Sequence, residues 1–343
     1  MKIAIDAMGG DNAPDEIVKG AFAALKGCRC DIVLVGDRER IKKCMPGKSI
    51  PKRITIHHTE QFVEMHENPT LALRKKKNSS ILLAAELLKK GEVSALISAG
   101  NTGALMESVL LTVGRVKGVK IKRPALSVFL PSYRQHTVFL DAGANSDCKP
   151  EYLLQFAKMG RIYARNILNR ENPKVGLINI GSESGKGNML TLAAYELLSR
   201  SDLNFVGNVE PRDLFYGEVD VAVADGFVGN MVLKTTEGTA ELLIRLLKDY
   251  IKQGNISKMA ALFLKPAFDK LKKKLDHSEY GGALLFGVNG VCIKSHGRAD
   301  SKTMQNAVKL AEKIVNQDII RRFAEDLSEE PQEEAPAVKS SAE

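Results

Sequence analysis

Tryptophan is absent from this 343-residue sequence, and cysteine, histidine and long apolar runs are scarce. The five cysteines are odd in number and irregularly spaced, which argues against a disulfide framework or a zinc site. No apolar run approaches the ~20 residues that cross a bilayer, and the first residues lack the apolar core of a signal peptide. We therefore expect a cytoplasmic protein without a metal site.

The familiar nucleotide-binding motifs are also missing. The stretch GLINIGSESGKGN, at 176–188, looks at first like a phosphate-binding loop. However, three residues separate Gly181 from Gly185 where a P-loop has four, and Gly187 stands where Ser or Thr would contact magnesium. The patterns G-x-G-x-x-G, G-x-S-x-G and H-E-x-x-H do not occur either. The sequence therefore argues against nucleotide hydrolysis and predicts no cofactor.

The net charge of +9 is unevenly distributed along the chain. Residues 324–343 hold seven acids and one base, a net charge of −6, so residues 1–323 carry +15. A body this basic favours an acidic protein or an anionic membrane surface as partner. Nucleic acid is a poorer fit, because no helix-turn-helix, zinc-finger or aromatic RNA-binding pattern is present. The acidic tail at 324–343 has the composition of a disordered segment.

Short β-rich apolar runs alternate with helical patterns along residues 1–323. This alternation predicts a single α/β domain with a mostly parallel sheet and helices on both faces. We expect strands at 2–6, 31–36, 53–57, 94–99, 125–131, 137–141, 174–180, 204–207 and 219–224. We expect helices at 14–26, 79–90, 102–112, 150–168, 189–199, 230–251 and 302–323.

Polar, glycine-rich loops follow six of these strands, at 6–14, 98–106, 141–150, 179–188, 207–213 and 224–230. Ligands of such sheets bind outside the carboxyl ends of the strands, so we expect the loops to gather at one edge.

Two of these loops have the parts of an anion site. Lys186 supplies a cation, Asn179 and Asn188 supply amides, and a helix begins directly after them, which suits a phosphate or a carboxylate. A second pocket would be formed by Asn101, Thr102 and Gly103. Two capped helices with an exposed lysine explain the same residues equally well.

The segment 252–280 is rich in both apolar residues and lysine. Its helical spacing continues past Pro266, where we expect the helix to break or kink. One interpretation is a helical hairpin buried in a dimer interface, and the other is reversible contact with a membrane surface. The residues expected to touch the membrane are Leu262, Phe263, Leu264 and Phe268.

In order and length, the polar clusters together resemble the bacterial fatty acyl phosphate synthases, the acyl-acyl-carrier-protein:phosphate acyltransferases. The similarity extends from residue 3 to about residue 300. The matching stretches include DAMGGDNAP, NPTLALRKKKNSS, SAGNTGALM, LDAGAN, LINIGSESGKGN, VADGFVGNMVLKTTEG and YGGALLFGVNGVCIKSHGRAD.

The resemblance implies that residues 1–323 are a Rossmann-like catalytic domain and that the protein is a homodimer, related in fold to phosphotransacetylases and isocitrate-type dehydrogenases. It implies transfer of a fatty acyl group from acyl carrier protein to inorganic phosphate. The acyl phosphate would feed a membrane glycerol-3-phosphate acyltransferase, at the opening of phospholipid synthesis. Such an enzyme would be cytoplasmic and peripherally associated with the inner face of the cell membrane, through weak attraction to anionic lipid.

This reaction needs neither a metal nor a catalytic triad, because phosphate is already an anionic nucleophile and orientation supplies much of the acceleration. We expect Lys186 with Asn188 to bind phosphate or the developing oxyanion. Asn145 and Asn230 would orient the thioester carbonyl. His296 is the candidate acid for the departing thiol, although a histidine that caps its own loop fits as well.

Charged residues beside these groups have weaker assignments. Glu183, like Asp6 and Asp141, would position neighbouring cations and amides. Arg74 and Lys75 could contact phosphate or an acidic helix of the carrier, whereas a solvated helix face is the simpler interpretation.

Other functions stay open at this point. A phosphotransacylase using acyl-coenzyme A fits the same loops. A membrane-associated scaffold with vestigial anion pockets is a non-enzymatic alternative. An isocitrate-type dehydrogenase fits less well, because no aspartate cluster is spaced to hold a divalent metal beside substrate-binding arginines.

Overall fold

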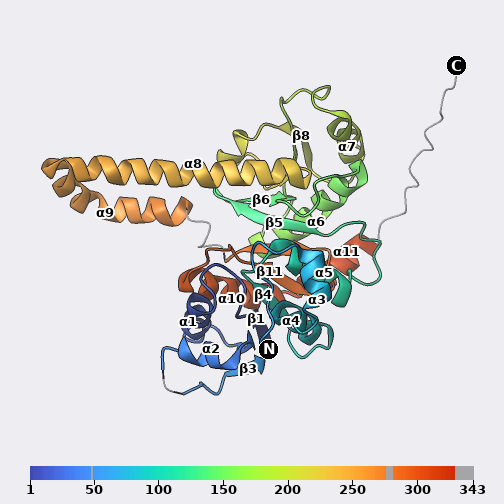
Figure 1. The fold of residues 1–343 in the computed structure, drawn as a ribbon. Helices are drawn as coiled ribbons and strands as arrows, with labels where there is room; N and C mark the ends of the chain where they lie inside the picture. The colour runs from blue at the N-terminus through green and yellow to red at the C-terminus, as the bar shows by residue number, and fades with distance from the viewer. Residues whose placement is uncertain (48, 276–280, 329–343) are drawn as a thin grey trace.

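The computed structural model describes residues 1–47, 49–275 and 281–328 (Figure 1). An 11-stranded sheet runs through the body in the order β3-β2-β1-β4-β11-β10-β5-β6-β9-β7-β8. Its strands are β1 (Lys2–Asp6), β2 (Asp31–Gly36), β3 (Ile54–His58), β4 (Ala95–Ser98), β5 (Ala125–Leu130), β6 (Thr137–Leu140), β7 (Val175–Ile178), β8 (Phe205–Val209), β9 (Val221–Val223), β10 (Ala283–Phe286) and β11 (Val291–Lys294).

Helices connect most of the strands. They are α1 (Asp15–Ala24), α2 (Arg38–Lys43), α3 (Pro69–Lys75), α4 (Ser80–Lys89), α5 (Thr102–Thr112), α6 (Pro150–Leu168), α7 (Met189–Ser199), α8 (Gly226–Gln253), α9 (Asn255–Leu275), α10 (Ser301–Asn316) and α11 (Ile319–Ser328). A short 3-10 helix spans Asp213–Phe215.

Both faces of the sheet are covered, as the near-continuous apolar strands predict. Along β1, Ile3 and Ile5 pack on one side with α1, α6 and α10, whereas Ala4 packs on the other side with α4 and α5. Beyond β5, the second side is covered by the start of α8, where Val232 and Leu233 pack against a smaller cluster. The predicted mostly parallel α/β sheet with helices on both faces is confirmed.

The direction of the strands reverses near the middle of the sheet. β1, β4 and β11 are parallel, but β10 pairs antiparallel with both β11 and β5, and β5 pairs antiparallel with β6. β9, β7 and β8 are parallel to β6 and one another. The four strands β6, β9, β7 and β8 therefore run opposite to β1, β4 and β11.

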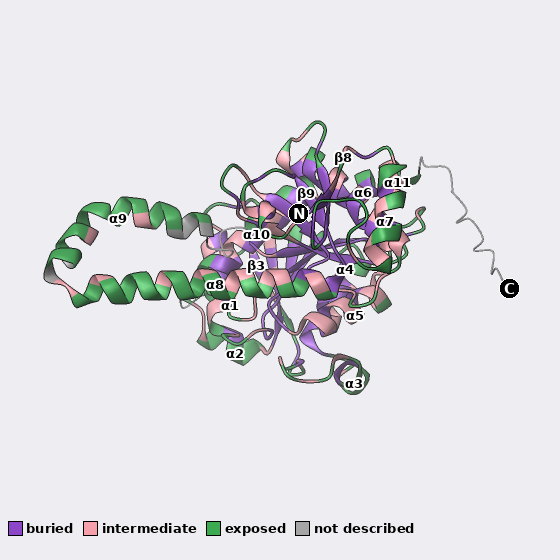
Figure 2. Ribbon diagram, turned by 90° about the horizontal axis from the view of Figure 1, so that it is seen from above, coloured by how far each residue is buried: buried purple, intermediate pink, exposed green. Residues whose placement is uncertain are grey.

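Helices α8 and α9 form a long hairpin that extends away from the body (Figures 1 and 2). Pro266 lies inside α9, which is one helix from Asn255 to Leu275, so of the break or kink predicted at this proline the break is wrong. The side chains of Leu262 and Phe263 are 72% and 84% exposed. Near the return end, Lys274 Nζ donates to the backbone oxygen of Tyr133 at 2.6 Å, which fastens α9 to the body.

Of the four residues predicted to touch a membrane, Leu262, Phe263 and Leu264 are exposed and Phe268 is partly buried. Within the described part of the chain, every helix is too short or too polar to cross a membrane.

The C-terminal helix α11 continues to Ser328. The prediction of a disordered tail from residue 324 is therefore wrong for residues 324–328, because Phe323 anchors the helix in the core and its amphipathic pattern persists. The rest of the predicted tail, 329–343, and the end of the predicted apolar-basic segment, 276–280, lie outside the described residues.

Candidate functional site

Three polar side chains form a row at the carboxyl ends of β1, β4 and β11. Asp6, Ser98 and Lys294 are register partners on neighbouring strands. Each lies two positions after a residue of the cluster that packs with α4 and α5, namely Ala4, Leu96 and Cys292. Ser98 Oγ donates to Asp6 Oδ2 at 2.8 Å, and Ser80 Oγ, at the start of α4, donates to Asp6 Oδ1 at 2.6 Å. Burial raises the pKa of Asp6, and these hydrogen bonds oppose the rise. Asp6 is thus a structural acceptor that ties β1 to β4 and α4.

Lys294 is a buried lysine that no motif in the sequence singles out. Its Nζ donates to the backbone oxygen of Ala99 at 3.3 Å and to that of Ser295. No carboxylate of the described chain forms an ion pair with it. Burial, and next the positive charge of Lys234, lower the pKa of Lys294 to about 8. One signal was available, since Lys294 is the single charged residue of the apolar run VCIK before a glycine turn.

Glycines allow the turns beside this row to approach closely. A Cβ atom on Gly9 would lie 2.8 Å from the backbone nitrogen of Gly100, so the turns after β1 and β4 touch only because both residues lack side chains. Gly10 has φ of +112°, a conformation that L side chains rarely adopt. The motifs DAMGGD and SAGNTG therefore form one packed unit.

The predicted second anion pocket, Asn101 with Thr102 and Gly103, opens α5 at this same edge. Asn101 caps the helix, since its Oδ1 accepts from the backbone nitrogen of Ala104 at 3.1 Å. Its Nδ2 donates to two backbone oxygens of the segment before α3, at 2.9 and 3.1 Å. The side chain of Asn101 is thus fully used by the fold. The amides of Thr102 and Gly103, in the first helical turn, have no acceptor within the helix.

His296 and the basic end of α3 differ in their exposure to solvent. His296 is half-buried, and its Nδ1 accepts from the backbone nitrogen of Arg298 at 3.1 Å, so the neutral ring carries its proton on Nε2. Arg74 and Lys75 are exposed in the last turn of α3. Their neighbour Lys76 instead pairs with Glu67 at 2.6 Å.

Asn145 belongs to the loop after β6, which Asp141 organises. Buried Asp141 accepts from the backbone nitrogens of Leu126, Ala144 and Asn145 at 2.9, 3.0 and 2.7 Å. The Nδ2 of Asn145 donates to Asp141 at 2.7 Å and to the backbone oxygen of Pro124 at 2.7 Å. Burial raises the pKa of Asp141, which these bonds oppose. Both amide hydrogens of Asn145 therefore serve the loop.

Asn230, the partner predicted for Asn145, lies in α8 and is exposed. A Cβ on Gly143 would lie 3.4 Å from the Cβ of Asn230, so Asn230 sits directly over the loop. The structure therefore places Asn230 beside the loop that contains Asn145, and Asn230 is exposed there.

Two asparagine side chains hold the backbone of the loop 181–187, whose motif GSESGKG resembles a P-loop. Asn179 Nδ2 donates to the backbone oxygen of Lys186 at 2.9 Å, and Asn208 Nδ2 donates to that of Glu183 at 2.7 Å. Asn188 caps α7 through the backbone nitrogen of Thr191 at 2.9 Å. Asn188, like Asn101, is therefore a helix cap, as the simpler interpretation of the sequence has it.

The charged groups of this loop point outward. Lys186 is exposed, and among the described residues no carboxylate lies within ion-pair distance of it. A Cβ on Gly181 would lie 2.8 Å from Glu183 Oε2 and 3.4 Å from Lys186 Cγ, so the two side chains flank the same glycine.

The loops do not gather at one edge of the sheet, and that prediction is wrong. Asp6, Ser98 and Lys294 follow strands that run one way, whereas Asp141, Asn179 and Asp225 follow strands that run the opposite way. The physical reason is the antiparallel insertion of β10 and β5. Helix α8 links the two groups of loops. Its cap residue Asp225 lies near Asn145, and it carries Lys234 close enough to affect Lys294 electrostatically.

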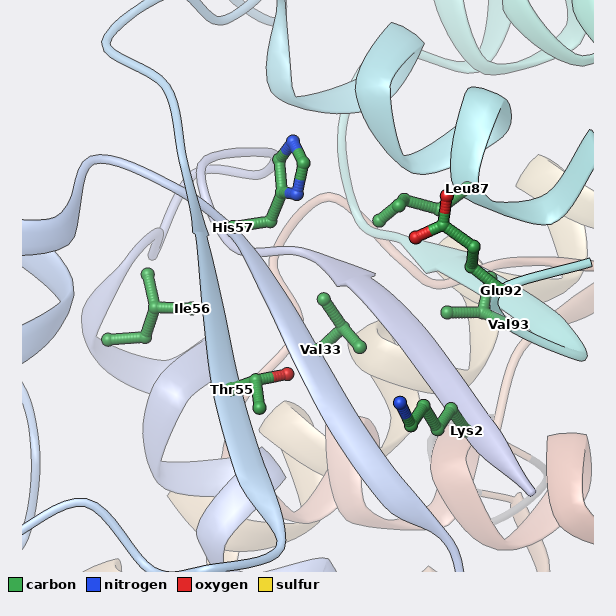
Figure 3. Close-up of a pocket in the computed structure, with 8 residues that line it drawn as sticks. All are labelled: Lys2, Val33, Thr55, Ile56, His57, Leu87, Glu92 and Val93. Carbon is green, nitrogen blue, oxygen red and sulfur yellow. The ribbon is translucent and has the colours of Figure 1, made fainter. Parts of the chain in front are cut away.

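A separate hollow of about 290 Å³ lies beside β1, β2 and β3 (Figure 3). It is bordered by Lys2, Thr55, His57 and Glu92, with apolar side chains between them. Lys2 begins β1, so this hollow opens toward the opposite end of that strand from Asp6. None of the predicted site residues lines it. Among the described residues, no group of three His, Cys, Asp or Glu side chains is arranged to hold a metal ion.

Comparison with known proteins gives concordant results over almost the whole chain. The sequence model of the family described as "Fatty acid synthesis protein" matches residues 1–322. A phosphate acyltransferase of Desulfitobacterium hafniense is 50% identical over 328 residues, which cover 95% of this chain and 98% of that protein. A phosphate acyltransferase of Dictyoglomus turgidum is 51% identical over 331 residues, which cover 96% and 98%.

The fold has solved counterparts as well. A phosphotransacetylase from Streptococcus pyogenes superposes with a TM-score of 0.60 at 15% identity and covers 94% of both chains. At this identity the likeness concerns the fold alone, and it agrees with the predicted relation to phosphotransacetylases.

Proposed function

The chain belongs to the fatty acid synthesis protein family, and from this premise we propose that it is a phosphate acyltransferase. It transfers a fatty acyl group from the thioester of acyl carrier protein to inorganic phosphate and releases acyl phosphate and free carrier protein. The observation that carries this proposal is the half-identical, nearly full-length match to proteins named phosphate acyltransferase.

The reaction is an acyl substitution at the thioester carbonyl. A phosphate oxygen attacks the carbonyl carbon, the carbon–oxygen bond forms, and the carbon–sulfur bond breaks with its electron pair on sulfur. The proton of hydrogen phosphate ends on the departing thiolate, so hydrogen phosphate and thioester give acyl phosphate and thiol. Holding the reactants in line and stabilising the oxyanion are the contributions that a protein without a covalent intermediate makes.

Acyl carrier protein is the proposed donor because the body is strongly basic. Residues 1–323 carry a net charge of +15, which favours encounter with an acidic protein. The alternative donor is acyl-coenzyme A. The experiment is a paired assay of the full chain with both thioesters of one acyl chain, measuring phosphate-dependent thiol release and acyl phosphate.

We expect kcat/KM for the carrier protein thioester to exceed that for coenzyme A by at least about tenfold, the effect of roughly 1.4 kcal/mol of added recognition. Equal values would contradict the choice of donor. Thiol release that does not require phosphate, or none at all, would contradict the activity itself and favour the scaffold alternative.

Two pockets can hold the anions of this reaction. One is the exposed loop of Lys186, with Glu183 beside it and the first-turn amides of α7 behind it. The other is the start of α5, with the amides of Thr102 and Gly103. Within these pockets we assign Asn179, Asn188 and Asn101 to shaping the loops, since their side chains are already hydrogen-bonded within the fold.

The remaining predicted residues have proposed roles of two kinds. Asn230 is proposed to meet the thioester carbonyl, with Asn145 holding the loop below it. His296 is proposed as a donor through Nε2 to the departing sulfur. Arg74 and Lys75, exposed at the end of α3, are proposed to meet the acidic carrier.

The hairpin of α8 and α9 is proposed to serve delivery of the product. Its exposed apolar side chains, among them Leu243, Phe263 and Leu271, are of the kind that mark contact with a partner protein or a membrane when they lie together on one surface. Two partners fit: a second copy of the chain, giving a homodimer, or the anionic inner face of the cell membrane. Membrane contact would bring acyl phosphate to a downstream glycerol-3-phosphate acyltransferase and make this cytoplasmic enzyme a peripheral membrane protein.

A further inference from the structure

Lys294 is a buried cation without a carboxylate partner in the described chain. Only 8% of the residue is exposed, and its hydrogen bonds go to the backbone oxygens of Ala99 and Ser295. Asp6, in the same row at the ends of these strands, already accepts from Ser80 and Ser98. An ammonium group held in this way is costly to bury, because neutral carbonyls replace only part of its hydration.

The surroundings of Lys294 are arranged for an anion. Lys294 holds the turn that leads into α5, whose first amides, on Thr102 and Gly103, lack acceptors within the helix. From the other half of the molecule, α8 brings Lys234 near enough for its charge to oppose that of Lys294. A buried cation and the turn that begins a helix thus lie together at the carboxyl ends of parallel strands, where ligands of such sheets bind, and a second cation acts on them from α8.

We propose that inorganic phosphate binds here, in contact with the ammonium group of Lys294 and the first-turn amides of α5, with Lys234 closing over it from α8. The identification of this anion as the substrate rests on the proposed function. The negative charges of Asp11 and then of Asp6 act in the opposite direction and favour the charged form of Lys294. Asp6 is tied to the two serines, which leaves the ammonium available to the ligand.

A small anion fits this site better than it fits the loop of Lys186. Lys294 is almost fully buried, so an oxyanion in contact with it loses most of its water and gains strong electrostatic attraction. Lys186 is exposed, where an ion pair is worth little. This choice leaves the Lys186 loop for an anionic group of the bulkier thioester donor.

Phosphate in this position would be poised as the nucleophile. Lys294 would neutralise charge on the non-attacking oxygens while one oxygen forms the bond to the carbonyl carbon and sulfur leaves with the electron pair. Among the described residues, the ion pair of Lys234 is with Glu237 of its own helix, at 2.7 Å, and the lysine side chain is 56% exposed. That pair is weak, so it can be exchanged for the phosphate.

The test uses the full chain and inorganic phosphate, with binding followed by calorimetry and turnover by the thioester assay. The variants are Lys294→Met, which keeps the length of the side chain without its charge, Lys234→Met, and the control Lys89→Met at the exposed end of α4. For Lys294→Met we expect the dissociation constant and the KM of phosphate to rise about tenfold or more, since a charged hydrogen bond is lost. We expect about threefold for Lys234→Met and no change for the control.

A folded Lys294→Met protein that binds phosphate as the wild type does would overturn the proposal. Should that variant fail to fold, an unchanged phosphate affinity in Lys234→Met, whose side chain is exposed, would overturn it as well. A rise in the KM of phosphate for Lys186→Met with none for Lys294→Met would assign phosphate to the other pocket. Wild-type protein that binds phosphate through Lys294 but forms no acyl phosphate would support the site while contradicting the proposed function.

Discussion

Lys294 on β11 lies directly across from Ser98 on β4, so an ammonium group and a hydroxyl close the ends of two neighbouring parallel strands. The pKa of Lys294 falls from its ordinary value of 10.5 to about 8. This difference corresponds to about 3 kcal/mol of destabilisation while the lysine is charged. The unfolded chain binds this proton more tightly, so Lys294 makes the free energy of unfolding rise with pH between about 8 and 10.5.

Lys294→Met is accordingly expected to stabilise the protein at pH 7, by roughly 1–2 kcal/mol after the loss of two hydrogen bonds is subtracted. Urea unfolding of both proteins from pH 6 to 10 measures this, and the advantage of the variant should shrink above pH 8, where the native lysine loses its charge. Stability curves that run parallel across this range would refute the buried, perturbed state of the lysine.

Gly229 and Gly238 lie on the same helix and make a matched pair. A Cβ on Gly229 would overlap the backbone oxygen of Asp141, whereas nothing lies within 4 Å of a Cβ on Gly238. Gly229→Ala should force α8 away from the Asp141 loop and destabilise the protein by about 2 kcal/mol or more. Gly238→Ala should stabilise it by about 0.5–1 kcal/mol through helix propensity. Thermal denaturation of the two variants checks this, and equal effects would mean that α8 does not approach Asp141 closely.

Lys186→Ala tests the exposed loop separately from the buried lysine. With phosphate assigned to Lys294, we expect the variant to raise the KM of the thioester donor about fivefold and to leave the KM of phosphate unchanged. Steady-state kinetics with each substrate varied in turn gives both values. If acyl phosphate forms at the wild-type rate at low donor concentration, Lys186 has no part in binding either substrate.

The double change Leu262→Glu and Phe263→Glu addresses the hairpin. Both side chains are largely exposed, and burying each in a membrane surface would contribute roughly 1.5–3 kcal/mol. We expect flotation with anionic liposomes to drop to background, while neutral liposomes bind neither protein because the lysines need anionic lipid.

Sedimentation of the same proteins without lipid gives the oligomeric state. Loss of a dimer with unchanged flotation would assign the hairpin to the partner subunit and exclude membrane contact through these two residues.

Much of the fold was predictable because apolar periodicity is a local property. Strand β1, with alternating Ile3, Ala4 and Ile5, shows its two buried faces directly. Strands β10 and β11 were missed because each is four residues long and lies in a glycine-rich segment. The direction of β10 determines which way the strands beyond it run, and so at which edge of the sheet their loops lie. No single strand shows which way its neighbour runs, so the separation of Asp6 from Asp141 could not be read from the chain.

The candidate site was harder to predict, because one residue type serves two purposes. Asn101 and Asn188 stand where either a helix cap or a ligand contact fits, and in the structure both are caps. The glycines on either side of Lys186 indicated a phosphate-binding loop, yet the lysine is exposed. Lys294 was not predicted to belong to the site, because its burial arises only in the assembled sheet. In the sequence, a lysine at the end of a short apolar run has the pattern of a surface residue.

The length of α8 sets a fixed spacing within the molecule. From Lys234 to Gln253 it continues without a break, which is roughly 30 Å of helix at 1.5 Å per residue. A continuous helix is rigid, so a surface that binds its far end is held at a fixed distance from the reacting groups near Lys234. A mixed anhydride made near Lys294 would then have to travel that distance before water hydrolyses it. The angle between the body and the surface that the hairpin binds would therefore affect how much of the product arrives intact.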